Sequence, residues 1–156
     1  MRVLLIHPIT RSKALVTDQE RTGIGYPNGI GYIGSYLESL GHDVIIHDNN
    51  QKCFGKDSLI KLFLDSSPDI VGISAMVNCY NQVLQLSRLI KDTINVPIVL
   101  GGPMATYSPK IVLKNMSVDI CVLGEGEETA GELFKLWPNY QNVPGIAYLN
   151  GKNEFF

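Results

Sequence analysis

The sequence is poor in cysteine, nearly balanced in charge and free of long apolar runs. Its three cysteines, Cys53, Cys79 and Cys121, are odd in number and widely spaced, which argues against a disulfide framework and against a local metal or cluster motif. This usage suits a reducing compartment, so we expect a cytoplasmic location. The 13 basic and 15 acidic residues give a net charge of −2, which offers no electrostatic reason to expect nucleic acid or an anionic membrane as a partner. No apolar run approaches the roughly 20 residues of a membrane span.

The sequence also lacks any known catalytic constellation. It has no P-loop and no Ser–His–Asp set, and no second histidine or carboxylate is placed with His7. The expected first strand ends in His7-Pro8 and the third ends in Ser74, where a response regulator needs acidic residues and an aspartate. His42 and His47 flank the expected second strand, away from the site. We therefore predict no catalytic and no metal-ligating residue.

What the sequence does contain is an alternation of short apolar runs with segments of helical period. With 156 residues, 45% of them hydrophobic and 18% charged, the chain is typical of one globular domain. We expect strands at residues 3–7, 44–47, 70–74, 97–100 and 119–123, and helices at residues 29–40, 57–65, 79–92, 108–115 and 127–136. This order predicts an α/β fold: a doubly wound, flavodoxin-like (Rossmann-like) parallel sheet of five strands in the order 2-1-3-4-5. Residues 146–149, followed by Asn150-Gly151, predict the start of a C-terminal hairpin.

Small residues follow several of the expected strands. In the order 2-1-3-4-5 a ligand crevice lies beyond the carboxyl ends of strands one and three, next to residues 8–28, 75–79, 101–107 and 124–127. The segments that leave room for a ligand there are Ser74-Ala75-Met76, Gly101-Gly102-Pro103 and Gly124-Glu125-Gly126-Glu127. Each segment also has a purely structural explanation. The serine can cap a helix, the glycine pair can form a tight turn, and acidic residues suit the start of a helix.

The letters of a dinucleotide-binding fingerprint occur at Gly29, Gly31 and Gly34, but in the wrong place. That fingerprint belongs in the tight turn directly after the first strand. Here about 20 residues intervene, and the glycines lie within a helical pattern that includes Ile30 and Ile33. Close packing of this helix on the sheet or on a ligand explains them better, so a dinucleotide-binding domain is disfavoured.

Taken together, these features resemble one family over nearly the whole chain. The motifs that carry the resemblance are Tyr26 to Leu37 with Gly41-His42 after it, Pro68 to Ser74, Val99 to Pro103, and Gly124 to Glu127. Their order and spacing are similar to those of the N-terminal cobalamin (vitamin B12)-binding domain of radical S-adenosylmethionine iron–sulfur enzymes. Members include cobalamin-dependent methylases and enzymes like the anaerobic magnesium-protoporphyrin monomethyl ester cyclase, often called Fe-S oxidoreductases.

The resemblance implies cobalamin as the cofactor, with the corrin ring over the carboxyl ends of the strands and the nucleotide tail inside the domain. Ser74 would line the tail pocket, and Gly101 and Gly102 would leave room for the tail. The segment from Gly124 to Glu127 would contact the tail or the corrin edge, and the loop before Pro27 would approach the lower face of the corrin. The implied cofactor-binding residues are Tyr26, Asn28, Gly29, Ser74, Ala75, Met76, Gly101, Gly102, Pro103, Gly124, Glu125, Gly126 and Glu127.

Two departures from the family pattern matter. Cobalamin domains that bind cobalt through a histidine carry the motif DxHxxG. With Gly29 as its last residue, the histidine position holds Tyr26 and the aspartate position holds Ile24, so no imidazole from this motif is expected to bind cobalt (the His-off arrangement). The CxxxCxxC cluster motif is also absent from the chain. The [4Fe–4S] cluster and S-adenosylmethionine are therefore expected only in a downstream domain.

We accordingly expect residues 1–143 to form the cobalamin-binding-type α/β domain. Residues 144–156 would begin a hairpin or linker toward the downstream radical S-adenosylmethionine domain, which would be its partner within the same protein. The chain alone is expected to be catalytically inert, as the cofactor-binding module of an oxidoreductase or methyltransferase. The alternative is a flavodoxin-like interaction or substrate-positioning module that has lost cobalamin binding.

Overall fold

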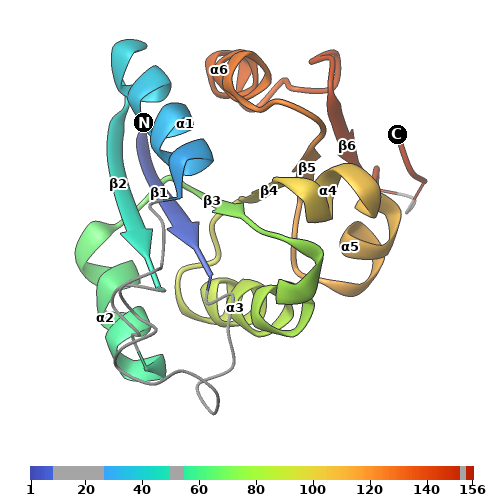
Figure 1. Cartoon of the computed structure of the whole chain (residues 1–156). Helices are drawn as coiled ribbons and strands as arrows, with labels where there is room; N and C mark the ends of the chain where they lie inside the picture. Colours follow the sequence, from blue (N-terminus) through green and yellow to red (C-terminus); the bar gives the residue numbers. More distant parts are fainter. Residues whose placement is uncertain (9–26, 50–54, 152–153) are drawn as a thin grey trace.

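A computed structural model describes residues 1–8, 27–49, 55–151 and 154–156. The strands are β1 (Arg2–His7), β2 (Asp43–Asp48), β3 (Ile70–Ser74), β4 (Ile98–Gly101), β5 (Ile120–Val122) and β6 (Ile146–Tyr148). They form one six-stranded sheet in the order β2-β1-β3-β4-β5-β6 (Figure 1). The pairings from β2 to β5 are parallel, and β6 runs antiparallel to β5.

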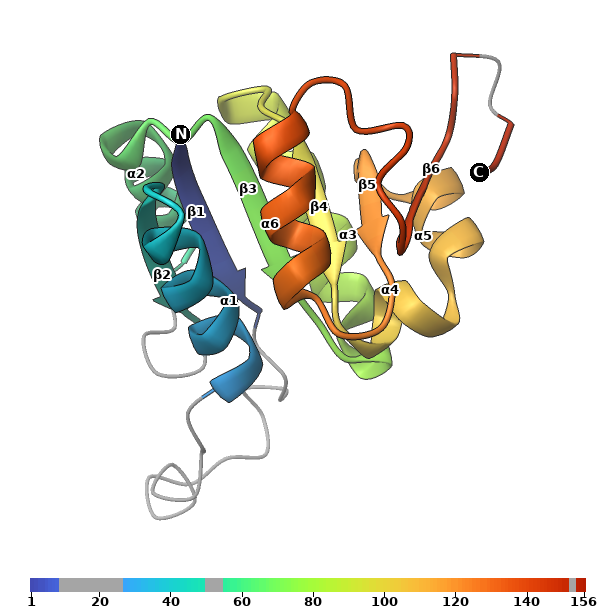
Figure 2. The same cartoon turned by 90° about the horizontal axis from the view of Figure 1, so that it is seen from above.

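Helices cover both faces of this sheet. They are α1 (Asn28–Ser39), α2 (Lys56–Ser66), the 3-10 helix η3 (Val77–Cys79), α3 (Tyr80–Thr93), α4 (Pro103–Tyr107), α5 (Pro109–Asn115) and α6 (Glu127–Leu136). α1 and α6 lie on one face, and α2 and α3 lie on the other (Figures 1 and 2). Within the described segments, no helix has the length and apolar character needed to cross a membrane.

The inner strands β1, β3, β4 and β5 are almost continuously apolar because both of their faces are buried, whereas the edge strand β2 is partly exposed. In β1, Val3 and Leu5 pack with α1 and α6, while Leu4 and Ile6 pack with α2 and α3. All four side chains are at most 4% exposed. Because successive side chains of a strand point to opposite faces, the sheet divides the core into two clusters.

The predicted fold class and the order of the first five strands are confirmed, but the sheet has one strand more than predicted. The segment expected only to begin a hairpin forms β6, in which Ala147 pairs with Cys121 of β5. A hairpin follows as predicted, because backbone hydrogen bonds join Tyr148 and Phe156 in both directions. The sixth strand covers the edge of β5, whose unpaired backbone groups would otherwise end the sheet.

The predicted helices match the structure closely except after β4. There the chain forms two short helices, α4 and α5, where a loop and one helix were predicted. Pro103 and Pro109 each begin one of them, at a position where the missing N–H of proline breaks no helical hydrogen bond. Gly102, just before Pro103, has a φ of +82°, which L-residues other than glycine rarely adopt.

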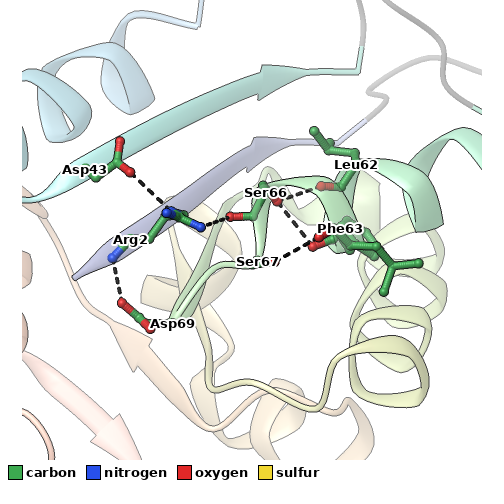
Figure 3. Close-up of polar contacts among 8 residues, drawn as sticks. Arg2, Asp43, Leu62, Phe63, Ser66, Ser67 and Asp69 are labelled. Atoms are coloured by element: carbon green, nitrogen blue, oxygen red, sulfur yellow. Dashed lines mark hydrogen bonds and ion pairs between the residues drawn. The ribbon is translucent and has the colours of Figure 1, made fainter.

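A polar cluster fixes the amino ends of β1, β2 and β3 (Figure 3). Arg2 Nε lies 3.2 Å from Asp43 Oδ2, and another guanidinium N–H donates to the carbonyl of Ser66 at 3.0 Å. The backbone N–H of Arg2 donates to Asp69 Oδ2 at 2.7 Å. The ion pair is largely exposed and adds little stability. These contacts join the amino ends of the three neighbouring strands.

Candidate functional site

A narrow cavity lies between α1 and α6, above the carboxyl half of the sheet. Its volume is about 50 Å³. Apolar side chains of the two helices form its walls, and the ends of β1, β3, β4 and β5 form its floor. The lining residues are Leu5, Ile30, Ile33, Leu37, Gly72, Ile73, Ser74, Val99, Gly101, Gly102, Val122, Gly124, Gly126, Ala130 and Phe134. We call this the α1–α6 cavity.

Five of the residues predicted for the site line this one cavity: Ser74, Gly101, Gly102, Gly124 and Gly126. They come from the ends of three different strands. Ser74 and Gly101 form the last pair of the β3–β4 ladder, which places them side by side. The parallel arrangement brings the residues after β5 to the same edge of the sheet. The register therefore explains why segments so far apart in the sequence meet.

The floor of the cavity is low because side chains are missing from it. A Cβ added at Gly101 or Gly124 would meet nothing within 4 Å. A Cβ at Gly72 would lie 2.6 Å from Leu5 Cδ2, so this glycine lets Leu5 lie flat on the sheet. Ser74 supplies a hydroxyl at the carboxyl end of an otherwise apolar floor. Such an arrangement fits a bulky ligand that has an apolar body and a few hydrogen-bonding groups.

The other predicted residues around the strand ends do not line the cavity. Ala75 is 2% exposed and packs into the core cluster on the opposite face of the sheet. Met76 is 51% exposed. Pro103 begins α4. Glu125 is exposed, and Glu127 is in the first turn of α6.

At the start of α1 the predicted residues also stay outside the cavity. Asn28 and Gly29 are exposed, and the first residue of α1 to line the cavity is Ile30. Tyr26 lies outside the described residues. Gly34 confirms the close packing predicted for this helix, since a Cβ there would lie 2.7 Å from Ile46 Cδ1 of β2.

The sequence interpretation missed the walls of the cavity. Ile33 and Leu37 of α1 and Phe134 of α6 follow the helical period of a core, and a cavity wall has the same pattern as a core. Gly72 could have been predicted from the sequence, because a glycine inside a buried strand indicates a close approach by another group.

The end of β1 carries a second polar feature. His7 pairs in register with Asp48 of β2, so a carboxylate does lie next to it, which the sequence interpretation did not find. By the alternation along β1, His7 faces the same side as Leu5, which lines the cavity. Its Nδ1 is buried and finds no hydrogen-bond partner among the described residues.

The buried cysteines are not suited to bind a metal. Burial raises the pKa of the Cys121 thiol from 9.0 to about 12. Burial also raises the pKa of Cys79 above its usual range. Both thiols therefore stay protonated at neutral pH, and the thiolate is the form that binds metals. Within the described ranges, no three histidine, cysteine or acidic residues lie close enough together to hold a metal ion.

A larger hollow of about 480 Å³ lies between α2 and α3, on the other face of the sheet. Polar side chains such as Lys56, Gln82 and Arg88 line it. None of the predicted site residues contributes to it, and the glycines at the ends of β4 and β5 lie at the α1–α6 cavity instead. The α1–α6 cavity is therefore the candidate site.

Comparison with known protein families decides what kind of domain this is. The family model described as "B12 binding domain" matches residues 15–134. This range includes every described element from α1 to β5 and most of α6. The chain belongs to the B12-binding domain family. This match favours the reading as a B12-binding domain over the flavodoxin-like interaction module.

Relatives of this B12-binding domain are longer proteins. The cytidylyl-2-hydroxyethylphosphonate methyltransferase of Streptomyces wedmorensis is 32% identical over 94% of this chain and 31% of its own length. The anaerobic magnesium-protoporphyrin IX monomethyl ester cyclase of Synechocystis is 27% identical over 95% of this chain and 30% of its own length. The chain thus spans less than a third of these curated relatives.

A solved structure shows the same fold. It is the radical S-adenosylmethionine methyltransferase TsrM from Kitasatospora setae, with cobalamin and a [4Fe-4S] cluster bound. It superimposes with a TM-score of 0.78 over 97% of this chain and 29% of its own, at 19% sequence identity. The similarity to the cobalamin-binding domains of radical S-adenosylmethionine enzymes, expected from the sequence, is thereby confirmed at the level of the fold.

Proposed function

We propose that this B12-binding domain binds cobalamin, with the nucleotide tail in the α1–α6 cavity and the corrin ring over the carboxyl ends of the strands. The observation that carries the proposal is the meeting of five small residues, from three strand ends, around one apolar cavity. The family match over residues 15–134 supports the choice of ligand. It also disfavours the alternative of an interaction module that has lost cobalamin.

Each group of residues has a distinct part in this proposal. Ser74 offers its hydroxyl to a polar group of the tail, since a hydroxyl can both donate and accept a hydrogen bond. Gly101 and Gly102 leave the floor free of side chains. The segment from Gly124 to Glu127, of which Gly124 and Gly126 line the cavity, contacts the tail or the corrin edge. Gly126 is both in the cavity lining and the residue that precedes α6.

The remaining predicted residues contribute at the rim. Met76 is exposed and presents an apolar side chain toward a corrin above the strand ends. Ala75 and Pro103 contribute indirectly, because the Ala75 backbone hydrogen-bonds to Gly101 and Met104 and Pro103 begins α4. We place Asn28 and Gly29, at the start of α1, beside the lower face of the corrin. The same role is proposed for Tyr26, which lies outside the described residues.

We also propose that no histidine of a DxHxxG motif binds the cobalt. The positions of that motif hold Tyr26 and Ile24, which lie outside the described residues. When bound, the cobalamin supplies a cobalt centre that carries a methyl group or electrons. The residues of this chain bind and orient the cofactor.

The longer relatives extend the proposal to a whole enzyme. We place a [4Fe–4S] cluster and S-adenosylmethionine in another part of a radical S-adenosylmethionine oxidoreductase or methyltransferase, with residues 144–156 leading toward it. Two facts support this: the chain spans less than a third of its relatives, and none of its three cysteines forms a cluster motif. The free, buried Cys79 and Cys121 suit a reducing cytoplasm.

Visible absorbance tests the cofactor directly. The purified chain is incubated with hydroxocobalamin, desalted, and its visible spectrum is recorded. We expect a corrin band to stay with the protein. A colourless protein after desalting would contradict the proposal and would favour the interaction module.

Cobinamide, which has the corrin ring but no nucleotide tail, tests the placement of the tail. If the tail lies in the α1–α6 cavity, cobinamide is retained much more weakly than hydroxocobalamin. Equal retention of the two corrinoids would mean that the domain holds the ring alone, and the assignment of the cavity would be wrong.

A further inference from the structure

The β-ladders end before the two glycine loops of the site. The last pair between β3 and β4 is Ser74 with Gly101, and the last pair between β4 and β5 is Leu100 with Cys121. Gly102 and Gly124 therefore lie beyond the ladders, with φ values of +82° and +71°. Without other contacts, nothing in the sheet would fix the distance between them.

Helix α4 supplies these contacts. The backbone N–H of Met104, in its first turn, donates to the carbonyl of Ala75 at 3.1 Å, which ties α4 to the end of β3. The backbone N–H of Thr106 donates to the carbonyl of Gly102 at 3.1 Å, and the hydroxyl Oγ1 of Thr106 donates to the same carbonyl at 3.2 Å. The N–H of Gly124 donates to Thr106 Oγ1 at 3.0 Å. One side chain thus joins the loop after β4 to the loop after β5.

The hydroxyl of threonine is suited to this double role. It donates one hydrogen bond and accepts others, so it can serve the Gly102 carbonyl and the Gly124 N–H together. The β-branched side chain restricts the rotation about χ1, which keeps the hydroxyl in place. Valine has nearly the same shape but can make neither hydrogen bond, so it separates the effect of the bonds from the effect of packing.

We infer that Thr106 is a positioning residue for the cofactor, because it holds Gly102 and Gly124 at the spacing that the α1–α6 cavity needs before the cofactor arrives. This inference rests on the proposed binding of cobalamin. It assigns a role to α4, an element that the sequence interpretation took for a loop. Thr106 does not itself line the cavity.

The test compares Thr106→Val with Thr106→Ser and with the control Thr93→Val. Thr93 is in α3, on the face of the sheet opposite the α1–α6 cavity. Thr93 Oγ1 donates to the carbonyl of Leu89 within α3, so the control also loses a threonine hydrogen bond. Thr106→Val loses both side-chain hydrogen bonds but keeps the backbone hydrogen bond to Gly102. We expect it to weaken hydroxocobalamin binding roughly tenfold. Thr106→Ser and Thr93→Val should bind as the unmodified chain does.

A second readout needs no cofactor. In the cofactor-free chain, the amide of Gly124 should exchange with deuterium faster in Thr106→Val than in Thr106→Ser, since its hydrogen-bond acceptor is gone. If Thr106→Val unfolds, Thr106→Ala removes the same hydroxyl without placing a methyl group among the polar backbone groups.

The outcomes separate the two proposals. If the unmodified chain does not retain cobalamin, the proposed function is wrong, whatever the variants do. If it retains cobalamin and Thr106→Val binds equally tightly, the positioning role is overturned while the proposed function stands. Unchanged exchange at Gly124 in Thr106→Val would likewise overturn the positioning role.

Discussion

Some glycines in this domain lie where another group must come close. Gly34 lets α1 contact Ile46, and Gly131 of α6 faces Tyr36 of α1, whose Cε1 would lie 2.6 Å from an added Cβ. Gly101 differs from both. An added Cβ there would meet nothing within 4 Å, and its backbone does not have the positive φ of Gly102. Neither packing nor backbone conformation requires a glycine at this position, and the same holds for Gly55. Gly101 differs from Gly55 because it lines the α1–α6 cavity, where a missing side chain leaves space for the proposed ligand.

Replacing Gly101 with leucine should fill this space. We expect Gly101→Leu to fold with little change in thermal stability and to lose most of its hydroxocobalamin, because the side chain would occupy the α1–α6 cavity. Retention after desalting and the melting temperature are the two measurements.

Gly55→Leu is the matched control for this substitution. Gly55 precedes α2 with an ordinary φ of −70°, and an added Cβ there would also meet nothing within 4 Å. The control should keep the cofactor. Retention by Gly101→Leu equal to that of Gly55→Leu would show that the cavity does not hold the tail.

Cys121 gives a prediction about pH. Burial raises its pKa from 9.0 to about 12, so between these values the unfolded chain releases a proton that the folded chain keeps. The contribution of this protonated thiol to stability is therefore complete below pH 9 and is lost as the pH rises toward 12. From pH 8 to pH 10 the stability difference between the unmodified chain and Cys121→Ala should shrink by roughly 1.4 kcal/mol.

Urea unfolding at the two pH values measures this change. Tyrosines and lysines also titrate in this range, but they titrate alike in both proteins and cancel in the difference. A difference that stays constant from pH 8 to pH 10 would mean that the folded Cys121 ionises as easily as an exposed thiol.

At the scale of elements, the sequence predicted the strands and helices whose hydrophobic patterns repeat over many residues. The buried strands and the long helices α1, α2, α3 and α6 carry clear periods over many residues, and their order fixes the sheet order of β1 to β5. α4 has only five residues, too few for a period, and its two flanking prolines suggest a loop as much as a helix start. β6 was missed as part of the sheet because a three-residue strand depends on its partner β5.

The site was predictable to the same extent. Small residues directly after the strands could be found from the sequence, since the strand order alone places these positions together. The cavity walls and the role of Thr106 could not be predicted from the sequence. Their roles depend on which helix face meets the sheet and on a hydrogen bond between loops 18 residues apart in sequence.

The extra strand leads to a prediction about truncation. A chain that ends at Gly145 loses β6, so the backbone groups of β5 become an exposed edge and Cys121 loses its partner Ala147, which is 1% exposed. We expect its melting temperature to fall by roughly 5–10 °C and its tendency to aggregate to rise. Thermal scans with light scattering measure both.

A chain that ends at Gly151 is the control for this truncation. It keeps β6 and loses only the returning arm of the hairpin. Its stability should stay near that of the full chain. If the chain ending at Gly145 is equally stable, β6 is an appendage rather than part of the sheet.

At the scale of the whole molecule, the amino ends and the carboxyl ends of the parallel strands have different roles. The amino ends of the strands are joined by the contacts of Arg2 (Figure 3), and α4 joins the carboxyl ends of β3, β4 and β5. The floor of the α1–α6 cavity is therefore fixed. Its walls are held by side-chain packing, as between Tyr36 and Gly131 and between Ile33 and Gly126. If the molecule adapts to a ligand, the helices are the parts that can move.

The cavity must indeed widen. Its volume is about 50 Å³, whereas sites for small molecules are typically about 300–1,000 Å³. For the proposed tail to enter, α1 and α6 must separate, and we expect this open state to be a minor population of the free domain. Its apparent affinity is lowered by the fraction of molecules that are open.

A smaller side chain in the wall should raise that fraction. Ile33 lines the cavity, is only partly buried and would lie 3.1 Å from a Cβ at Gly126, so Ile33→Ala removes a contact that holds the helices together. We expect hydroxocobalamin to bind several-fold faster to Ile33→Ala than to the unmodified chain. Stopped-flow quenching of Trp137, the only tryptophan, by the bound corrin measures the rate.

Ile94→Ala is the control, because Ile94 is also partly buried but packs against the core on the other face of the sheet. Both variants remove the same atoms from a partly buried isoleucine. A general loosening of the fold would therefore speed binding to both, and only a wall that must open before binding would speed it for Ile33→Ala alone.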